Sequence, residues 1–140
     1  MKVQVGEWEL VVDIAQTQHF YKSLPHNNED MFGLNYIEVC SFYEPEISHF
    51  FQQLGIDLLK PTNLHSLPLE GNSIMYSGCY HIVGERLQGE FEEWDVFVEP
   101  FCFALTEGQY IKPQQLLNAS VEISFEVVLP WMLFEPIPTI

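Results

Sequence analysis

Residues 74–83 read Ile74-Met75-Tyr76-Ser77-Gly78-Cys79-Tyr80-His81-Ile82-Val83. Successive side chains of a β-strand point to opposite faces of the sheet, so residues two apart share a face. Tyr76 and Tyr80 therefore lie on one face, and Cys79 and His81 lie together on the other. The alternation predicts a strand over these residues.

Two other stretches alternate in the same way. Residues 8–14 place Trp8 and three aliphatic side chains on one face. Residues 121–129 place five apolar side chains on one face, and Glu122 and Ser124 are among the residues on the other. Both stretches are predicted as strands, and the second is predicted to have one face in water.

The stretch from Trp94 to Leu105 changes face in its middle. Trp94, Val96 and Val98 have even residue numbers and share one face of a strand. The apolar residues at 101, 103 and 105 have odd numbers and share the other face. Proline cannot donate to a sheet ladder and is tolerated at bulges. We therefore predict one strand with a β-bulge at Glu99-Pro100.

Two further segments have less regular patterns. Leu34 to Cys40 is predicted as a strand. Gly84 to Gly89 follows the strand at 74–83 and contains two glycines. This composition favours the turn of a hairpin over a phosphate-binding loop.

One helix is predicted, over about residues 45–55. Pro45 suits a first helical turn, and apolar residues recur at helical spacing from Ile47 to Leu54. Gly55 is the residue type that ends a helix. Because a helix of about three turns is not stable alone, its apolar face must pack on a sheet.

These elements predict an α+β fold that is mainly antiparallel β, a sandwich or a partly closed barrel, with the helix packed on the sheet. Successive strands leave little room for the long connections that parallel pairing needs. No repeat, low-complexity tract or change of composition divides the chain. Residues 1–140 are therefore predicted to form a single domain.

The chain is strongly acidic. Its 140 residues contain 5 Lys and Arg against 20 Asp and Glu, which gives a formal charge of -15. This charge makes nucleic acid and anionic membranes poor partners. Neither a signal peptide nor an apolar stretch of about 20 residues, the length that spans a membrane, is found in the sequence. Three cysteines without a CxxC pair are typical of reduced thiols, so we expect a cytoplasmic protein.

Three motifs combine packing residues with glycines. They are Glu46-Ile47-x-x-Phe50-Phe51-x-x-Leu54-Gly55-Ile56-Asp57, Tyr76-x-Gly78-x-Tyr80-His81-x-x-Gly84 and Leu129-Pro130-Trp131-x-Leu133-x-Glu135. Together they resemble an uncharacterised family of small bacterial proteins, over most of the chain after residue 35. The resemblance implies one compact fold and no particular activity. Members carry several cysteines just before the helix, where this chain has only Cys40.

Cys79 and His81 are the candidate metal ligands. A thiolate and an imidazole on one strand face are half of a zinc site, so zinc is the one candidate metal, and otherwise no cofactor is predicted. Zinc needs three or four ligands, and neither Cys40, Cys102 nor any carboxylate stands at a ligand spacing from the pair. The alternative is structural: Cys79 fills the core, and His81 is a hydrogen-bonded or half-exposed strand residue.

The candidate partner-binding segment is Glu90-Phe91-Glu92-Glu93-Trp94-Asp95. Its four carboxylates and two aromatic rings could attract and anchor a basic protein. The alternative is a solvated strand start whose charges keep an exposed edge from pairing with another chain.

Three functions from different classes follow. The first is an acidic interaction module that binds a basic protein partner, as an immunity-type inhibitor of a basic toxin or a regulatory subunit would. The second is a small-ligand-binding β domain with a cavity lined by aromatic residues. The third, ranked last, is an enzyme, either metal-dependent through Cys79 and His81 or a carboxylate-based hydrolase, because the sequence has no nucleophile–base signature. The oligomeric state is left open.

Overall fold

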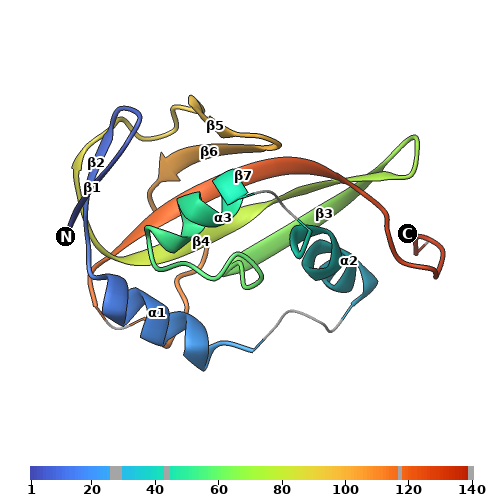
Figure 1. Cartoon of the computed structure of the whole chain (residues 1–140), viewed down its shortest axis with the longest axis horizontal. Coiled ribbons are helices and arrows are strands. Elements are labelled where there is room, and N and C mark those ends of the chain that lie inside the picture. Colours follow the sequence, from blue (N-terminus) through green and yellow to red (C-terminus); the bar gives the residue numbers. More distant parts are fainter. Residues whose placement is uncertain (26–29, 43–44, 117, 139–140) are drawn as a thin grey trace.

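The computed structural model describes residues 1–25, 30–42, 45–116 and 118–138. Within these ranges the chain forms a seven-stranded antiparallel sheet with three helices packed against it (Figure 1). The predicted fold class, α+β and mainly antiparallel, is confirmed. The sheet is not closed, and two long strands run along most of the molecule.

The strand order is β1-β2-β4-β7-β6-β5, and β3 also pairs with β4. All of these pairs are antiparallel. The bounds are β1 Lys2–Val5, β2 Trp8–Val12, β3 Asn63–Leu69, β4 Ser73–Gln88, β5 Val96–Val98, β6 Phe101–Thr106 and β7 Ser120–Pro130. The predicted strands at 74–83 and 121–129 thus correspond to β4 and β7, and most of 8–14 corresponds to β2.

β4 organises the sheet, because it pairs along its whole length. Residues 73–83 pair with β7, and residues 84–88 continue the strand and pair with β2. The predicted hairpin turn at Gly84–Gly89 is therefore wrong. A glycine is needed at position 84 because β2 comes very close to β4 there. A Cβ on residue 84 would lie 1.9 Å from the carbonyl oxygen of Val11.

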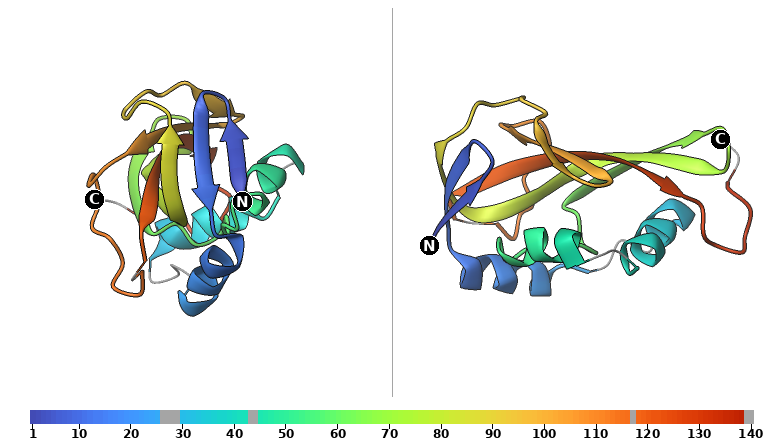
Figure 2. Two further views of the ribbon diagram at one scale, coloured as in Figure 1. Left: turned by 90° about the vertical axis from the view of Figure 1, so that its left-hand side faces the viewer. Right: turned by 45° about the horizontal axis from the view of Figure 1, so that its top comes forward.

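The helices are α1 (Ile14–Ser23), α2 (Met31–Cys40) and α3 (Pro45–Gln52). All three lie on the same side of the sheet (Figure 2). Asp13 and Asp30 start α1 and α2 by accepting hydrogen bonds from the backbone N–H groups of Gln16 and Gly33. This layer covers one face of the sheet and leaves its other face outside the helical layer.

α3 confirms the predicted helix, and α2 corrects a predicted strand. The apolar residues from Ile47 to Leu54 are buried, and Gly55 has a φ of +78°, in the left-handed region that ends helices. Leu34–Cys40 is helical because Asp30 caps it and because Tyr36 and Val39 are buried three residues apart. The sheet is therefore covered by more helices than the one predicted.

The predicted bulge at Glu99-Pro100 is a hairpin. Val98 pairs with Phe101, so the two residues between them form a turn that joins β5 to β6. Directly paired residues share a face, which accounts for the change of parity from Val98 to Phe101. Trp94 lies outside the strand.

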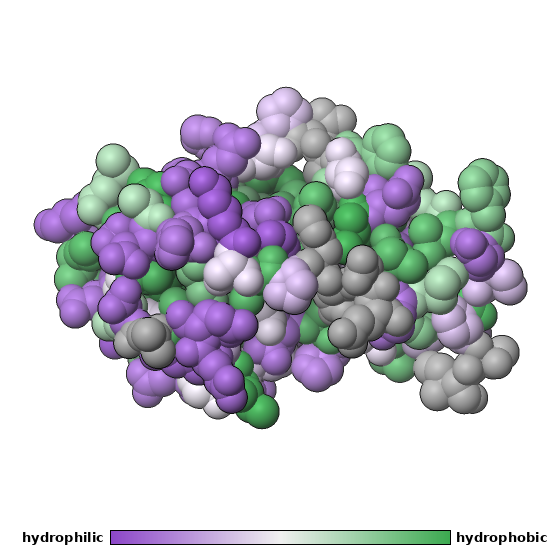
Figure 3. All heavy atoms as spheres, turned by 90° about the horizontal axis from the view of Figure 1, so that it is seen from below, coloured by the Kyte–Doolittle hydropathy of each residue, from purple (hydrophilic) through white to green (hydrophobic). Residues whose placement is uncertain are grey.

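The core lies between the helices and the sheet. Aromatic rings from both layers meet there: Tyr36 contacts Tyr76 and Phe125, and Phe51 contacts Tyr80. Seen from the helical side, hydrophilic side chains predominate towards α1, and hydrophobic ones are more frequent towards the other end (Figure 3). No helix within the described ranges is long and apolar enough to cross a membrane.

Candidate functional site

Cys79 and His81 lie on the face of β4 that points away from the helices. The residues of opposite parity, Tyr76 and Tyr80, pack on Tyr36 and Phe51 of the helical layer. The predicted common face for Cys79 and His81 is confirmed, because the two side chains contact each other. We call this face the outer face of the sheet.

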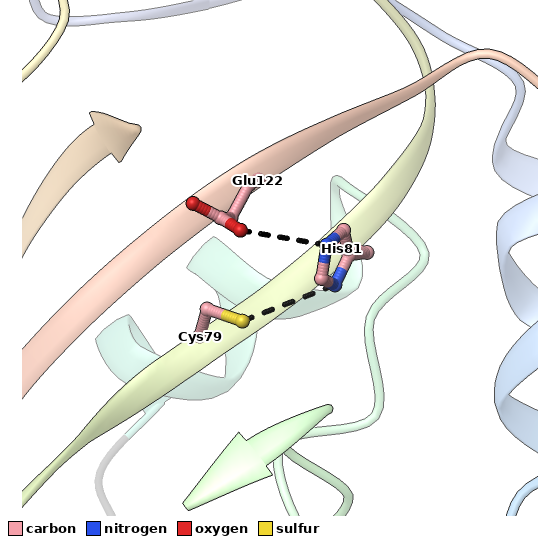
Figure 4. Close-up of side chains that lie close together, drawn as sticks. All are labelled: Cys79, His81 and Glu122. Carbon is pink, nitrogen blue, oxygen red and sulfur yellow. Dashed lines mark hydrogen bonds and ion pairs between the residues drawn. The ribbon is translucent and has the colours of Figure 1, made fainter. Parts of the chain in front are cut away.

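Glu122 of β7 joins this pair. It is directly opposite His81 in the antiparallel register, and its Oε1 lies 3.9 Å from His81 Nε2 (Figure 4). Cys79 Sγ lies 3.9 Å from His81 Nδ1. One ligand atom from each residue can be chosen so that all three lie within 4.8 Å of one another, and all three residues are buried. The imidazole therefore stands between a thiol and a carboxylate.

Three hydrogen-bond donors hold the Glu122 carboxylate in place. The backbone N–H groups of Gln109 and Tyr110 donate to its two oxygens at 3.1 Å each, and the hydroxyl of Thr106 donates to Oε2. A further hydrogen bond joins Thr106 to Ser124. The segment after β6 thus folds over this end of the outer face and fixes the carboxylate beside His81.

Thr62 and Asn63 hold the other two side chains. The Thr62 hydroxyl lies 2.7 Å from His81 Nδ1, 3.3 Å from Cys79 Sγ and 3.0 Å from the Cys79 carbonyl oxygen, to which it donates. The side-chain amide of Asn63 donates to Cys79 Sγ at 3.5 Å. Asn63 is the first residue of β3, which pairs with this part of β4, and Thr62 directly precedes it.

Burial sets the protonation of the pair. The pKa of His81 is lowered to about 4, because burial outweighs the opposing effect of the Glu122 carboxylate and Lys112 acts in the same direction as burial. Burial also raises the pKa of Cys79 to about 11, against the hydrogen bonds from Thr62 and Asn63. At neutral pH the imidazole is therefore uncharged and the thiol keeps its proton.

A pocket of about 510 Å³ opens beside this cluster. His81 and Glu122 are part of its wall, as are Arg86 and Lys112. The chain has only 5 Lys and Arg, so two of its few cationic side chains face this one hollow.

The sequence analysis did not identify Glu122 as a candidate ligand, and it predicted the wrong environment for this residue. The 121–129 pattern predicts a wet face for Glu122 and Ser124, yet Glu122 is only 6% exposed and Ser124 only 1%. The prediction is wrong at these two residues because the segment after Thr106 covers them. Alternation assigns Glu122 to a face, but it does not say which residue of β4 stands opposite.

No family model, curated protein or solved structure matches the chain. The resemblance to the small bacterial family stays a prediction from motifs. The function is therefore argued from the geometry of the outer face.

The acidic segment Glu90–Asp95 is a connection between β4 and β5, not the predicted strand start. All four carboxylates are exposed, and Trp94 is 37% exposed. Phe91 is half-buried, with the guanidinium of Arg86 4.4 Å from its ring centre. Glu92 and Trp94 line a hollow together with Glu126 of β7, which places this part of the segment at the outer face.

An apolar row crosses the outer face beyond the buried cluster. Met75 of β4 pairs with Leu67 of β3 on one side and with Val128 of β7 on the other. Phe97 of β5 reaches the same face through its pairing with Cys102. We define the outer patch as these apolar residues with their acidic and aromatic neighbours: Leu67, Met75, Val128, Phe97, Trp94, Glu92, Asp95 and Glu126.

Proposed function

We propose that this protein binds a basic protein partner through the outer patch. The observation that supports the proposal is an exposed apolar row on a sheet face, bordered by carboxylates. The helices lie on the opposite face, so this surface is not needed to hold them.

Three apolar residues of the patch are exposed to solvent. Phe97 is 70% exposed, Leu67 58% and Val128 49%. Single exposed apolar residues are common, whereas contiguous ones on a monomer are typical of interaction sites. Removing such surface from water contributes about 25 cal/mol per Å² to association. The row thus supplies a driving force that a flat polar surface lacks.

The charged part of the patch selects the partner. Glu126 and Asp95 stand close enough to Cys102 to add to burial in raising its pKa. Glu92 lines the neighbouring hollow, and no member of the patch is Lys or Arg. A surface of this kind attracts a cationic partner and accelerates the encounter.

A second copy of the chain fits this surface less well. Each copy carries a formal charge of -15, and pairing two patches would bring their carboxylates together. Like charges juxtaposed across an interface cost several kcal/mol. A basic surface with an apolar centre satisfies both parts of the patch. An inhibitor of a basic toxin and a regulatory subunit of a basic protein are two roles that fit.

The test compares capture by three immobilised forms of the protein at low salt. They are the wild type, Val128→Lys in the patch and Leu34→Lys on α2, which is the matched control because Leu34 is a half-exposed leucine on the helical side. The expected partner binds the wild type and the control, is released by salt and fails to bind Val128→Lys. Titration of the purified partner should show at least about a tenfold loss of affinity for Val128→Lys, or 1.4 kcal/mol.

Two results would overturn the proposal. One is that low-salt capture yields no partner that salt releases. The other is a purified partner whose affinity is the same for Val128→Lys and wild type. Sedimentation of the protein alone tests the remaining alternative, which is that a second copy of the chain binds the patch. A wild-type dimer that Val128→Lys dissociates would support that alternative.

The pocket beside His81 supports a second candidate, small-ligand binding. Its volume of about 510 Å³ is in the range of small-molecule sites. Its wall carries charges of both signs, Arg86 and Lys112 against Glu85, Glu107 and Glu122, which favours a zwitterionic molecule. Titration with amino acids should shift the NMR signals of Gly84 and Gly108, which line the pocket, and leave that of Gly71 unchanged. Equal shifts of the three glycine signals would contradict ligand binding in this pocket.

A further inference from the structure

We propose that Cys79, His81 and Glu122 bind a Zn²⁺ ion. The proposal is independent of partner binding, because none of the three residues belongs to the outer patch. It begins from the donor set: a thiol sulfur, an imidazole nitrogen and a carboxylate oxygen are the three side-chain ligands that zinc accepts. The sequence supplied two of them, and the register of β4 against β7 supplies the third.

The distances suit a single ion. Zn–S bonds of about 2.3 Å and Zn–N or Zn–O bonds of about 2.0 Å place tetrahedral ligand atoms about 3.3–3.7 Å apart. One ligand atom from each residue can be chosen so that all three lie within 4.8 Å of one another, whereas the two 3.9 Å distances involve different nitrogens of His81, Nδ1 for Cys79 Sγ and Nε2 for Glu122 Oε1. A single ion binds only one of these nitrogens, so zinc binding requires the side chains of Cys79 and Glu122 to turn towards the same ring nitrogen.

The hydrogen bonds at His81 point to the nitrogen that binds. The single proton of the Thr62 hydroxyl is donated to the Cys79 carbonyl oxygen, so the hydroxyl accepts from His81 Nδ1–H at 2.7 Å. Nε2 then presents its lone pair towards the carboxylate oxygen of Glu122, 3.9 Å away. Two electron-pair donors that face each other across such a gap are suited to a cation between them. A zinc-binding histidine characteristically donates its other N–H in this way.

The surroundings hold the ligands as a metal site requires. Glu122 is fixed by the N–H groups of Gln109 and Tyr110, and Cys79 accepts from Asn63. His81 and Glu122 also face the 510 Å³ pocket, whereas Cys79 is not part of its wall. Three protein ligands with solvent access on one side leave a fourth position for water or a ligand group, the arrangement of open zinc sites.

Binding also balances the buried charge. Zn²⁺ forms a bond to Cys79 Sγ as the S–H bond breaks, and the proton passes to solvent. The ion, one thiolate and one carboxylate then sum to zero charge. A neutral cluster is favourable in a buried setting, where an isolated charge is costly.

The first measurement needs no variant. Untagged protein is reconstituted with zinc, freed of loose metal by dialysis and analysed for metal content. We expect about one equivalent per chain, and substitution with Co²⁺ should give the thiolate-to-cobalt charge-transfer absorption that only a cysteine ligand produces. Less than about a tenth of an equivalent, or a cobalt spectrum without that band, overturns the proposal.

Variants then assign the ligands. Cys79→Ser and Glu122→Gln should each weaken zinc binding by at least about 100-fold, because even residues behind the ligands are worth 10–100-fold. Cys102→Ser and Glu126→Gln are the matched controls on the same face and should bind like wild type. Circular dichroism of each variant establishes that it is folded. A Glu122→Gln protein that is folded and binds zinc as tightly as wild type removes Glu122 from the site.

Substitution of Lys112 should strengthen zinc binding, whereas substitution of a ligand should weaken it. Its ammonium group lies close enough to lower the pKa of His81, so it also repels a bound cation. Lys112→Met should tighten zinc binding several-fold at low salt, and the gain should shrink as salt is added. A gain of affinity cannot come from misfolding. No change in Lys112→Met, together with normal binding by the control variants, would place the zinc elsewhere on the chain.

Discussion

His81 on β4 and Glu122 on β7 occupy directly opposed positions in the antiparallel register, with Nε2 and Oε1 3.9 Å apart. Each side chain is almost fully buried, at 3% and 6% exposure. A buried carboxylate is costly unless hydrogen bonds replace its water. Glu122 receives them from Thr106, Gln109 and Tyr110, so the segment after β6 and the end of the outer face depend on one another.

This dependence predicts that Glu122→Gln destabilises the metal-free protein. The glutamine amide keeps one acceptor oxygen and replaces the other with an NH2 group, which faces a backbone donor. We expect the free energy of unfolding to fall by about 2 kcal/mol, measured by urea denaturation with chelator present. Glu126→Gln on the same strand is the control, and its exposed side chain should change stability by less than about 0.5 kcal/mol. Equal effects of the two substitutions would contradict the prediction.

Gly78 should not tolerate a side chain. It stands where β3 crosses close to β4, and a Cβ there would lie 1.9 Å from the carbonyl oxygen of Asn63. Gly78→Ala must push β3 away from β4, and we expect a loss of about 3 kcal/mol or more in urea denaturation. Gly71→Ala is the comparison, because a Cβ at Gly71 meets no atom within 4 Å. Its cost is limited to about 1 kcal/mol, for a positive φ. A smaller loss for Gly78→Ala than for Gly71→Ala would show that this close approach is not structural.

The sequence predicted those parts of the fold that depend on local periodicity. Alternation located β4 and β7 and put Cys79 and His81 on one face, and helical spacing located α3. The hairpin at Glu99-Pro100 was missed because a bulge and a two-residue turn produce the same change of parity. Leu34–Cys40 was misassigned because its β-branched and aromatic residues suit either structure, and the cap at Asp30 decided it.

The third member of the buried cluster could not be predicted. His81 and Glu122 meet because β4 and β7 pair in one register, and that register depends on the whole sheet. The burial of Glu122 depends further on where the segment after Thr106 folds. Neither property has a local sequence signal. A glutamate in a strand with polar neighbours reads as a solvated residue.

Thiol chemistry should distinguish the three cysteines. Cys40 and Cys79 are buried, and burial raises their pKa values to about 12 and about 11. Cys102 is half-buried on the outer face, so it alone should react at once with an aromatic disulfide reagent near pH 8. Cys102→Ser should abolish the fast phase. Glu126→Gln should accelerate it, because the Glu126 carboxylate adds to burial in raising the pKa of Cys102. Two fast thiols in the wild type would contradict the burial of Cys79 or Cys40.

Alkaline pH should unfold the protein through its buried tyrosines. Burial raises the pKa of Tyr76 to about 12 and that of Tyr36 well above its usual value of 10.0. In the unfolded chain both ionise near pH 10, while in the folded chain they stay neutral. The unfolded state therefore binds fewer protons above pH 10, and stability falls as pH rises, by about 1.4 kcal/mol per pH unit for each such group.

Tyr36→Phe tests this relation. The substitution removes a hydroxyl that is hydrogen-bonded to Tyr80, so it should cost about 1 kcal/mol near neutral pH. Between pH 10 and 11, however, the free energy of unfolding of the variant should fall by about 1 kcal/mol less than that of the wild type. The two stabilities therefore converge as pH rises. Tyr110→Phe, at a half-buried tyrosine of the outer face, should leave the slope closer to that of the wild type. Parallel curves for Tyr36→Phe and wild type would mean that Tyr36 ionises in the folded protein.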